Sequence, residues 1–183
     1  MLEGKNVILR PLTLADAPHT LELRLDTETN LAFLGYVFPI NEANERRWIE
    51  SLYAEGPRRR ADFAIVDRRT GDFAGLIAIT DLDHLHQRAR FGILLRRDAR
   101  GKGLAPDAMS VLFDYAFHQL NLSRVWLEVL AENERAVNLY KRFGFVHEGT
   151  LRSHYFQDGR FKDLLVMGLQ RSEFEPSGGG RGR

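Results

Sequence analysis

The chain has 183 residues, of which 44% are hydrophobic and 28% are charged, the composition of an ordinary globular domain with a sizeable core. Its formal net charge of +1 offers no strong attraction to nucleic acid or to a membrane surface. The chain contains no cysteine, which excludes disulfides, a thiolate nucleophile and cysteine-bound zinc. It also lacks a signal peptide's apolar stretch and any run of about 18 apolar residues, so we expect a cytoplasmic protein.

The first third of the chain predicts one strand and two helices. Residues 6–10 have the composition of a short strand. Thr13 can cap a helix over about residues 14–25, where apolar residues recur at helical spacing. Residues 42–53 show the pattern of a second helix, and the apolar segment 31–40 between the two helices is expected to be a packed loop.

The middle of the chain predicts mainly strands. Alternating or continuous apolar residues bounded by turn residues are typical of strands. This pattern occurs in four segments, which are residues 61–67, 73–83, 89–95 and 124–130.

Two further helices and a final pair of strands are predicted in the C-terminal half. One helix begins near residue 105 and continues to about Leu120, and another covers residues 132–143. Gly144 is a suitable C-terminal stop for the second of these helices. Residues 145–151 and 161–169 are expected to form strands around a turn.

The order of these elements predicts a mixed α/β sheet of about seven strands with flanking helices in a single domain. We expect that domain to cover residues 1–174. The remaining residues, 175–183, are rich in glycine and lack apolar anchors, so we expect a disordered tail.

A glycine-rich turn joins the strand at 89–95 to the following helix. It consists of Arg100, Gly101, Lys102, Gly103, Leu104 and Ala105. The first N–H groups of a helix have no internal partner and the helix dipole favours an anion there, while glycines let the backbone approach phosphate oxygens. Pro106 stands where a dinucleotide-binding pattern needs a third small residue, and no Walker motif is present. The turn therefore indicates a phosphate site, with an ordinary strand-to-helix turn as the alternative.

The two ordered motifs of the chain resemble those of the GNAT superfamily of N-acetyltransferases. Arg100, Gly103 and Ala105 match its R/Q-x-x-G-x-G/A signature. The second motif is carried by Asn133, Ala136, Leu139, Tyr140, Lys141, Gly144 and Phe145. Residues 148–169 are similar to the RimJ/RimL branch and to the related spermidine acetyltransferases.

The resemblance implies that acetyl-CoA, as co-substrate and without a metal ion, lies in a cleft where two neighbouring strands splay apart. Its pantetheine arm would pair with the backbone of Ile93, Leu94 and Leu95, and its pyrophosphate would bind the N–H groups of the glycine-rich turn. Asn133 and Asn138 would bond the pantetheine arm or the nucleotide. A homodimer is the assembly that relatives often form.

The catalytic groups follow from the same resemblance. Tyr140 would act as general acid toward the departing thiolate, since a phenol is protonated at pH 7; the alternative is a core tyrosine. Many members carry a glutamate on the strand before the phosphate turn, where this chain has Arg90, which cannot accept a proton. Asp81 is our candidate base, with solvent water and a polar hairpin end as alternatives. Three further polar residues lie nearby, namely Asp83, His84 and His86.

Three interpretations of the activity remain open. The favoured one is direct acetylation of an α-amino group on a protein or peptide, or of a small primary amine. A polyamine acceptor needs converging carboxylates, and the acidic residues of the first two helical regions are interspersed with arginines. A non-catalytic acyl-CoA-binding module is supported by Arg90 but not by Tyr140. The arginine run at 58–60 is expected to be a loop edge that can reach an acidic substrate or the 3′-phosphate of CoA.

Overall fold

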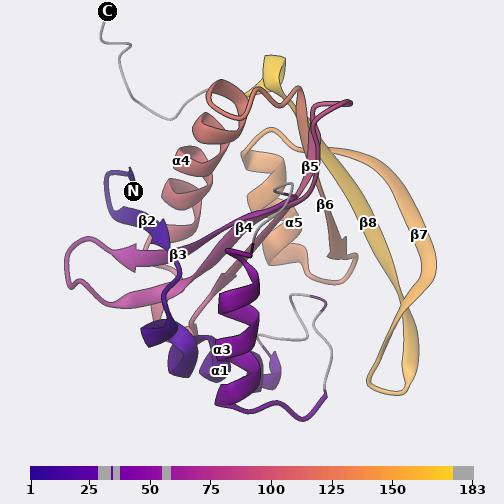
Figure 1. Cartoon of the computed structure of the whole chain (residues 1–183). Coiled ribbons are helices and arrows are strands. Elements are labelled where there is room, and N and C mark those ends of the chain that lie inside the picture. The colour runs from indigo at the N-terminus through magenta and orange to yellow at the C-terminus, as the bar shows by residue number, and fades with distance from the viewer. Residues whose placement is uncertain (29–33, 35–37, 55–58, 175–183) are drawn as a thin grey trace, which may run out of the picture.

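In the computed structural model, which describes residues 1–28, 34, 38–54 and 59–174, eight strands form one sheet. The strand order is β1-β2-β3-β4-β5-β6-β8-β7, and helices lie on both faces of the sheet (Figure 1). The sheet confirms the predicted mixed α/β class. The predicted disordered tail, residues 175–183, lies outside the described residues.

The strands agree closely with the predicted segments in the middle of the chain. Their bounds are β1 (Leu2–Glu3), β2 (Val7–Pro11), β3 (Ala61–Asp67), β4 (Phe73–Asp83), β5 (Arg88–Leu95), β6 (Arg124–Leu130), β7 (Val146–Gln157) and β8 (Arg160–Gln170). The sequence pattern missed β1, which is held by pairing with β2 rather than by any apolar pattern of its own. The last two strands are longer than predicted because their hairpin continues through exposed polar residues, where alternation with apolar residues is lost.

The helices begin and end at recognisable local signals. Their bounds are α1 (Ala17–Leu25), α3 (Glu42–Ser51), α4 (Leu104–His118) and α5 (Glu134–Arg142). The side chain of Asn41 accepts the N–H of Asn44 and so caps α3. Gly144 has a φ of 97°, which permits the left-handed turn that ends α5. The helix predicted at residues 14–25 is divided in the structure, where Leu14–Asp16 form a 3₁₀ turn and α1 begins at Ala17.

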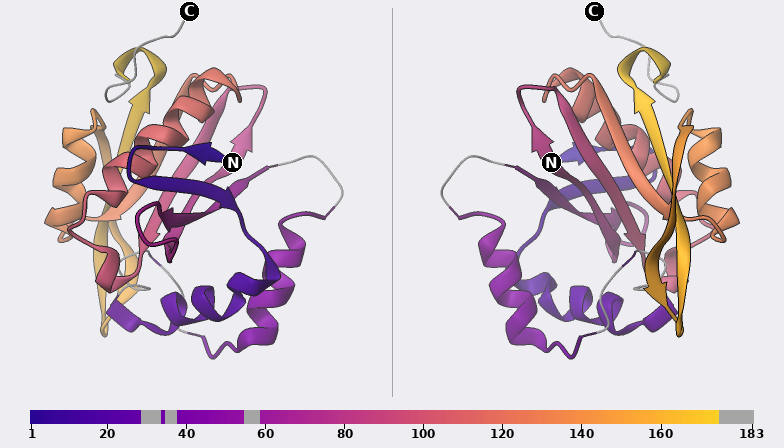
Figure 2. Two further views of the ribbon diagram at one scale, coloured as in Figure 1. Left: turned by 90° about the vertical axis from the view of Figure 1, so that its left-hand side faces the viewer. Right: turned by 90° about the vertical axis from the view of Figure 1, so that its right-hand side faces the viewer.

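The two faces of the sheet are covered by different helices. Ile77 and Phe91 belong to the main core, which α4 and α5 complete, whereas Leu76 and Leu94 pack toward α1 and α3. Alternate residues of one strand thus point to opposite faces. Figures 1 and 2 show α1 and α3 together at the lower end of the molecule, away from α4. The main core is dominated by aromatic rings around Phe113.

The pairing of β5 with β6 is parallel and short, and it positions everything that follows. Cα partners run from Arg88 with Arg124 to Arg90 with Trp126, while β5 continues to Leu95 without β6 as a partner. The other neighbouring strands among the described residues pair antiparallel. A parallel pair needs a crossover connection, which α4 provides. The glycine-rich turn therefore lies just beyond the splayed end of β5.

Hydrogen bonds to Asp107 join the N-terminal segment to the first turn of α4. The carboxylate of Asp107 accepts the backbone N–H groups of Lys5, Asn6 and Val7 at distances of 3.2, 2.6 and 3.0 Å. Gly4 packs against the same side chain, since a Cβ there would lie 2.7 Å from Asp107 Oδ2. The position of the α4 N-terminus is thus fixed by a segment about a hundred residues away in the chain.

We predict that Phe113→Ala lowers the free energy of unfolding by about 3–5 kcal/mol, because it leaves a cavity among packed rings. Phe113 is fully buried and its ring lies 4.8 Å from that of Phe91. Urea denaturation followed by circular dichroism measures the change. Leu85→Ala is the control, and it should change stability by less than about 0.5 kcal/mol because Leu85 is exposed. Equal effects of the two substitutions would contradict this description of the core.

Candidate active site

A cleft of about 710 Å³ opens where β5 and β6 separate, between the glycine-rich turn and α5. It is lined by all of the predicted cofactor residues except Lys102 and Asn138, namely Ile93, Leu94, Leu95, Arg100, Gly101, Gly103, Leu104, Ala105 and Asn133. The two sequence motifs, which are separated by a whole strand, thus meet across one hollow. The splayed cleft expected from the family resemblance is present.

The glycine-rich turn presents an open helix N-terminus to this cleft. Gly101 and Gly103 have φ values of 77° and 76°, a conformation that other residues rarely adopt. Gly103 is the N-cap of α4 and offers no side chain to bond the first N–H groups of that helix. A Cβ at Gly103 would meet no protein atom within 4 Å, so the space above the turn is empty of protein. Uncapped N–H groups beside open space are suited to bind phosphate oxygens.

Three predicted cofactor residues have surroundings that the sequence did not foretell. The side-chain oxygen of Asn133 accepts the N–H of Ala136 and caps α5. Lys102 lines a separate hollow on the other side of the turn, together with Lys5 and other residues. Asn138 is exposed on α5 and is not among the residues that line the cleft.

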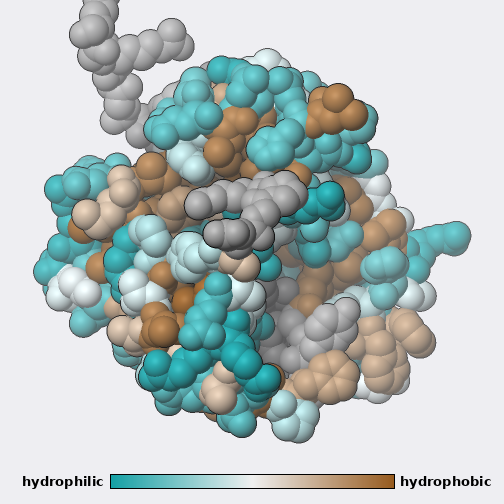
Figure 3. Space-filling model, viewed as in Figure 1, coloured by the Kyte–Doolittle hydropathy of each residue, from teal (hydrophilic) through white to brown (hydrophobic). Residues whose placement is uncertain are grey.

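A second hollow, which we call the chamber, adjoins the cleft and has a volume of about 330 Å³. Residues of α1, β3, β4, β5, β6 and α5 line it. Ile93, Leu94, Ala136 and Tyr140 line both the cleft and the chamber. Figure 3 shows hydrophobic side chains inside a recess beside the hydrophilic surface of the lower helices. The two hollows therefore adjoin each other at Tyr140 and the other three shared residues.

Tyr140 lies at the junction of the cleft and the chamber. Its ring packs edge-on against Phe91, with ring centroids 6.2 Å apart, and also contacts Phe145. Burial raises the pKa of Tyr140 to about 12, because the phenolate would lose its hydration. The hydroxyl is therefore protonated at neutral pH and can donate a proton or a hydrogen bond to a group in either hollow.

An ion pair that the sequence did not predict lies in the chamber. Arg90 Nη2 donates to Glu128 Oε2 at 2.8 Å, and the guanidinium carbon of Arg90 lies 5.7 Å from the ring centre of Trp126. The available signal was the alternation within β6, where Val125, Leu127 and Val129 are buried and the polar Glu128 between them is half-buried and lines the chamber. Position 90 thus holds an arginine where many family members have a glutamate, and a glutamate, Glu128, lies beside it on the neighbouring strand β6.

Asp81, the candidate base from the sequence, does not line the chamber, although its charge acts on Arg60, which does. Asp81 is exposed, has a φ of 50°, and lines neither hollow. The backbone N–H and the ring of His86 bond Asp83 and, together with the charge of Arg88, lower the pKa of Asp83 to about 2. Thr80, the residue before Asp81, does line the chamber.

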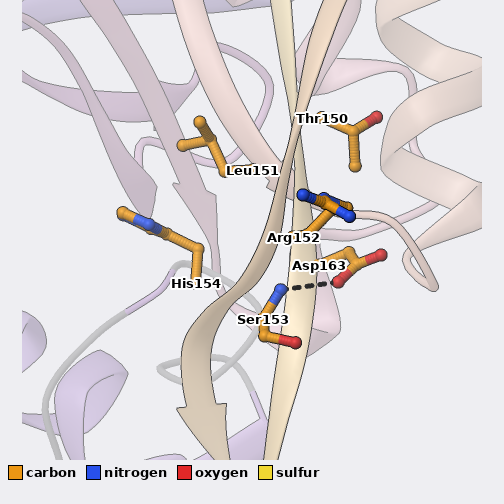
Figure 4. Close-up of a pocket in the computed structure, with 6 residues that line it drawn as sticks. All are labelled: Thr150, Leu151, Arg152, Ser153, His154 and Asp163. Carbon is orange, nitrogen blue, oxygen red and sulfur yellow. Dashed lines mark hydrogen bonds between the residues drawn. The ribbon is translucent and has the colours of Figure 1, made fainter.

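A further open hollow lies along the hairpin of β7 and β8 (Figure 4). The register of β7 slips between Leu151 and Tyr155, and Ser153 has a φ of 50°. The Ser153 N–H donates to Asp163 Oδ1 at 2.7 Å, which holds this bulge to β8. In Figure 4, Leu151 and His154 point to one side of the strand and Arg152 to the other. The hollow results from the irregular edge strand and adjoins neither catalytic motif.

The part of the chain that the structure describes has neither a metal-binding cluster nor a membrane-spanning helix. There, no three histidine, aspartate or glutamate side chains gather closely enough to hold a metal ion. Within the same residues, none of the helices has the length and apolar character needed to cross a bilayer.

Comparison with protein families and curated proteins gives a consistent assignment. The acetyltransferase (GNAT) domain family matches residues 6–146. The chain is 30% identical over 176 residues to the spermidine N(1)-acetyltransferase of Escherichia coli K12, covering 95% of this chain and 91% of that protein. It is also 26% identical over 175 residues to YdaF of Bacillus subtilis, which is named, provisionally, as a ribosomal N-acetyltransferase; the match covers 94% of this chain and 95% of YdaF.

A solved structure supports the same assignment. The spermidine N-acetyltransferase of Vibrio cholerae in complex with CoA and spermine superposes with a TM-score of 0.85 at 26% identity, covering 93% of this chain and 98% of that one. The chain belongs to the GNAT acetyltransferase family, and it is an acetyl-CoA-dependent N-acetyltransferase.

Proposed function

We propose that the chain transfers the acetyl group of acetyl-CoA to a primary amine held in the chamber, with Tyr140 at the point of transfer. The observation that carries the proposal is the shared lining of the two hollows around Tyr140. One hollow has an open phosphate-binding turn and the other lacks one. A thioester in the cleft would therefore expose its carbonyl carbon to an amine that enters from the chamber.

The cofactor would be held mainly by backbone groups. The edge of β5 from Ile93 to Leu95 has no pairing with β6, so the amide groups of the pantetheine arm can add to it as a strand would. The pyrophosphate would accept hydrogen bonds from the backbone N–H groups of the turn from Gly101 to Ala105, and Arg100 would add a positive charge beside it. Asn133 and Asn138 remain predicted contacts of the pantetheine arm or the nucleotide, the first of them from within the cleft.

The chemical step would be direct transfer. The lone pair of the amine attacks the thioester carbon and forms a tetrahedral oxyanion, which backbone N–H groups of β5 can stabilise. The carbon–sulfur bond then breaks, and the thiolate takes the proton of the Tyr140 hydroxyl. Tyr140 recovers a proton from solvent, so that the net products are the acetamide and CoA.

The proton that the amine loses requires an acceptor near the chamber. Among the described carboxylates, Asp62 and Glu128 line it. Asp62 accepts two hydrogen bonds from Arg60, whereas Glu128 accepts one from Arg90 through Oε2 and keeps Oε1 for a proton. We therefore propose Glu128 as the acceptor. Asp81, the candidate from the sequence, would have to act through water because it does not line the chamber.

The acceptor amine is the second half of the proposal. The relatives in Escherichia coli and Vibrio cholerae are named for spermidine, which makes a polyamine one candidate. The ribosomal name of YdaF and the RimJ/RimL resemblance make a protein α-amino group the other. A mass-spectrometric screen of spermidine against N-terminal peptides separates the two. We further propose a homodimer, as the resemblance implies, and a cytoplasmic location, as the sequence composition led us to expect. The net charge of +1 supports no nucleic-acid partner.

We predict that Gly103→Leu abolishes CoA binding, because the new side chain would occupy the phosphate position. Gly71→Leu is the matched control: Gly71 has a φ of 79° and equally open surroundings, but it lies in a distant turn. Isothermal titration calorimetry with CoA measures both variants. Binding by Gly103→Leu that equals binding by the control would remove the phosphate from this turn.

We predict that Tyr140→Phe lowers kcat by roughly 10²–10⁴-fold, the usual scale for a general acid, with little change in CoA affinity. Thiol release under saturating acetyl-CoA and acceptor gives kcat. Tyr115→Phe is the control. Tyr115 belongs to α4, packs against Phe63 of β3, and lines neither hollow. A Tyr140→Phe enzyme with normal turnover would exclude the hydroxyl from the mechanism.

We predict that ionisation of Tyr140 causes no decline in kcat between about pH 7 and pH 10. The protonated phenol is the active form, and its raised pKa keeps it protonated to a higher pH than an ordinary tyrosine. The pKa of about 12 places its loss beyond this range. The measurement is kcat against pH, corrected for uncatalysed thioester hydrolysis. A falling limb near pH 10 that is absent from Tyr140→Phe would show that the phenol is not desolvated.

A further inference from the structure

Three arginines line the chamber, and each is paired with a carboxylate. The three pairs lie in different parts of the fold. Arg24 of α1 lies 2.9 Å from Glu45, and its guanidinium stacks over Trp48. Arg60, which precedes β3, bonds Asp62 at 2.6 Å. The third pair is Arg90 with Glu128, described above. Each arginine is therefore paired with one carboxylate, of which Asp62 and Glu128 line the chamber and Glu45 does not, and the charge of Asp81 also acts on Arg60.

The pairs share one orientation, in which the arginine is the more accessible partner. The side chains of Arg24 and Glu45 are 35% and 3% exposed, those of Arg60 and Asp62 are 42% and 7%, and those of Arg90 and Glu128 are 35% and 19%. In each pair the carboxylate is thus the less exposed partner, although Asp62 and Glu128 also line the chamber. A molecule in the chamber meets three guanidinium groups, each of them already paired with a carboxylate.

This orientation determines which acceptors fit. A guanidinium has five N–H donors in a planar fork, and one carboxylate occupies at most two or three of them. The remaining donors suit a second anionic group, such as a carboxylate or a phosphate. A polyamine needs a carboxylate for each ammonium that leaves water, and here each of those carboxylates is already paired with an arginine, which carries the same charge as the ligand.

We propose that the preferred acceptor is a primary amine that also carries a carboxylate or phosphate group within a few bonds, and that Arg60 and Arg90 bind this anion while the amine points toward Tyr140. The proposal rests on the proposed function, because the chamber must be the acceptor site. The strand register supports the placement. Thr80 pairs with Arg90, Asp62 pairs with Ala78, and Ala78 pairs with Gly92, so the groups lie on adjacent strands of one sheet face.

The test compares acceptors that differ only in the anion. Thiol release from acetyl-CoA is measured with 4-aminobutyrate against n-butylamine, with phosphoethanolamine against ethanolamine, and with spermidine. Two peptides with glutamate or glutamine at their second residue extend the comparison to α-amino groups. We expect the anionic member of at least one pair to have a kcat/KM about tenfold or more higher than its partner, and spermidine to be poorer than that member.

The outcomes separate the two proposals. If no acceptor releases thiol while CoA still binds, the proposed function fails. If amines are acetylated but spermidine or the neutral members are the better substrates, the proposed function stands and the anionic acceptor is overturned. The pair that shows the preference distinguishes a carboxylate from a phosphate.

Variants of Arg60 locate the preference. Arg60→Met uncovers Asp62, so we expect the advantage of the anionic acceptor to fall about tenfold and the activity with spermidine to rise. The double variant Arg60→Met with Asp62→Asn should lose the advantage without any gain for spermidine. Arg171→Met is the control, since Arg171 is exposed and lines neither the cleft nor the chamber. An unchanged preference in a folded Arg60→Met enzyme, as judged by thermal melting, would overturn the role of Arg60; if that variant does not fold, Arg60→Gln provides the same comparison.

Discussion

The pairing of β5 with β6 stops after Arg90 and Trp126, and the active site depends on this interruption. A parallel pair that continued to the end of β5 would close the cleft and satisfy the edge that a pantetheine arm can use. The same interruption exposes the far end of β6, where Glu128 faces the chamber. One change in strand pairing therefore produces both the cofactor cleft and the acceptor chamber.

The sequence predicted the parts of the fold that have strong local signals. The strands at 61–67 and 73–83 and the glycine-rich turn agree with the structure, because apolar runs and φ-positive glycines act locally. The short strand β1 and the extension of β7 beyond residue 151 escaped prediction, since they depend on pairing with neighbours rather than on their own composition. The two motifs indicated the cleft correctly because each forms one of its walls.

The chamber was harder to predict, for a physical reason. Its charged groups come from α1, β3, β5 and β6, and each reads as an ordinary surface or edge residue in its own segment. What matters is which member of an ion pair covers the other, and sequence spacing carries no information about that. Glu128 illustrates the point: it stands in an apolar strand, and its role becomes visible once Arg90 is seen opposite it.

The contact of Asp107 with the N–H groups of Lys5, Asn6 and Val7 couples distant parts of the chain. Asp107 belongs to the first turn of α4, the helix whose N-terminus faces the cofactor cleft. Any modification that displaces residues 5–7, such as a bulky fusion or local trimming, would tilt that turn. Residues 5–7 thus hold in place the cofactor-facing turn that is formed about a hundred residues later in the chain. Displacing them would be seen first as weaker binding of CoA.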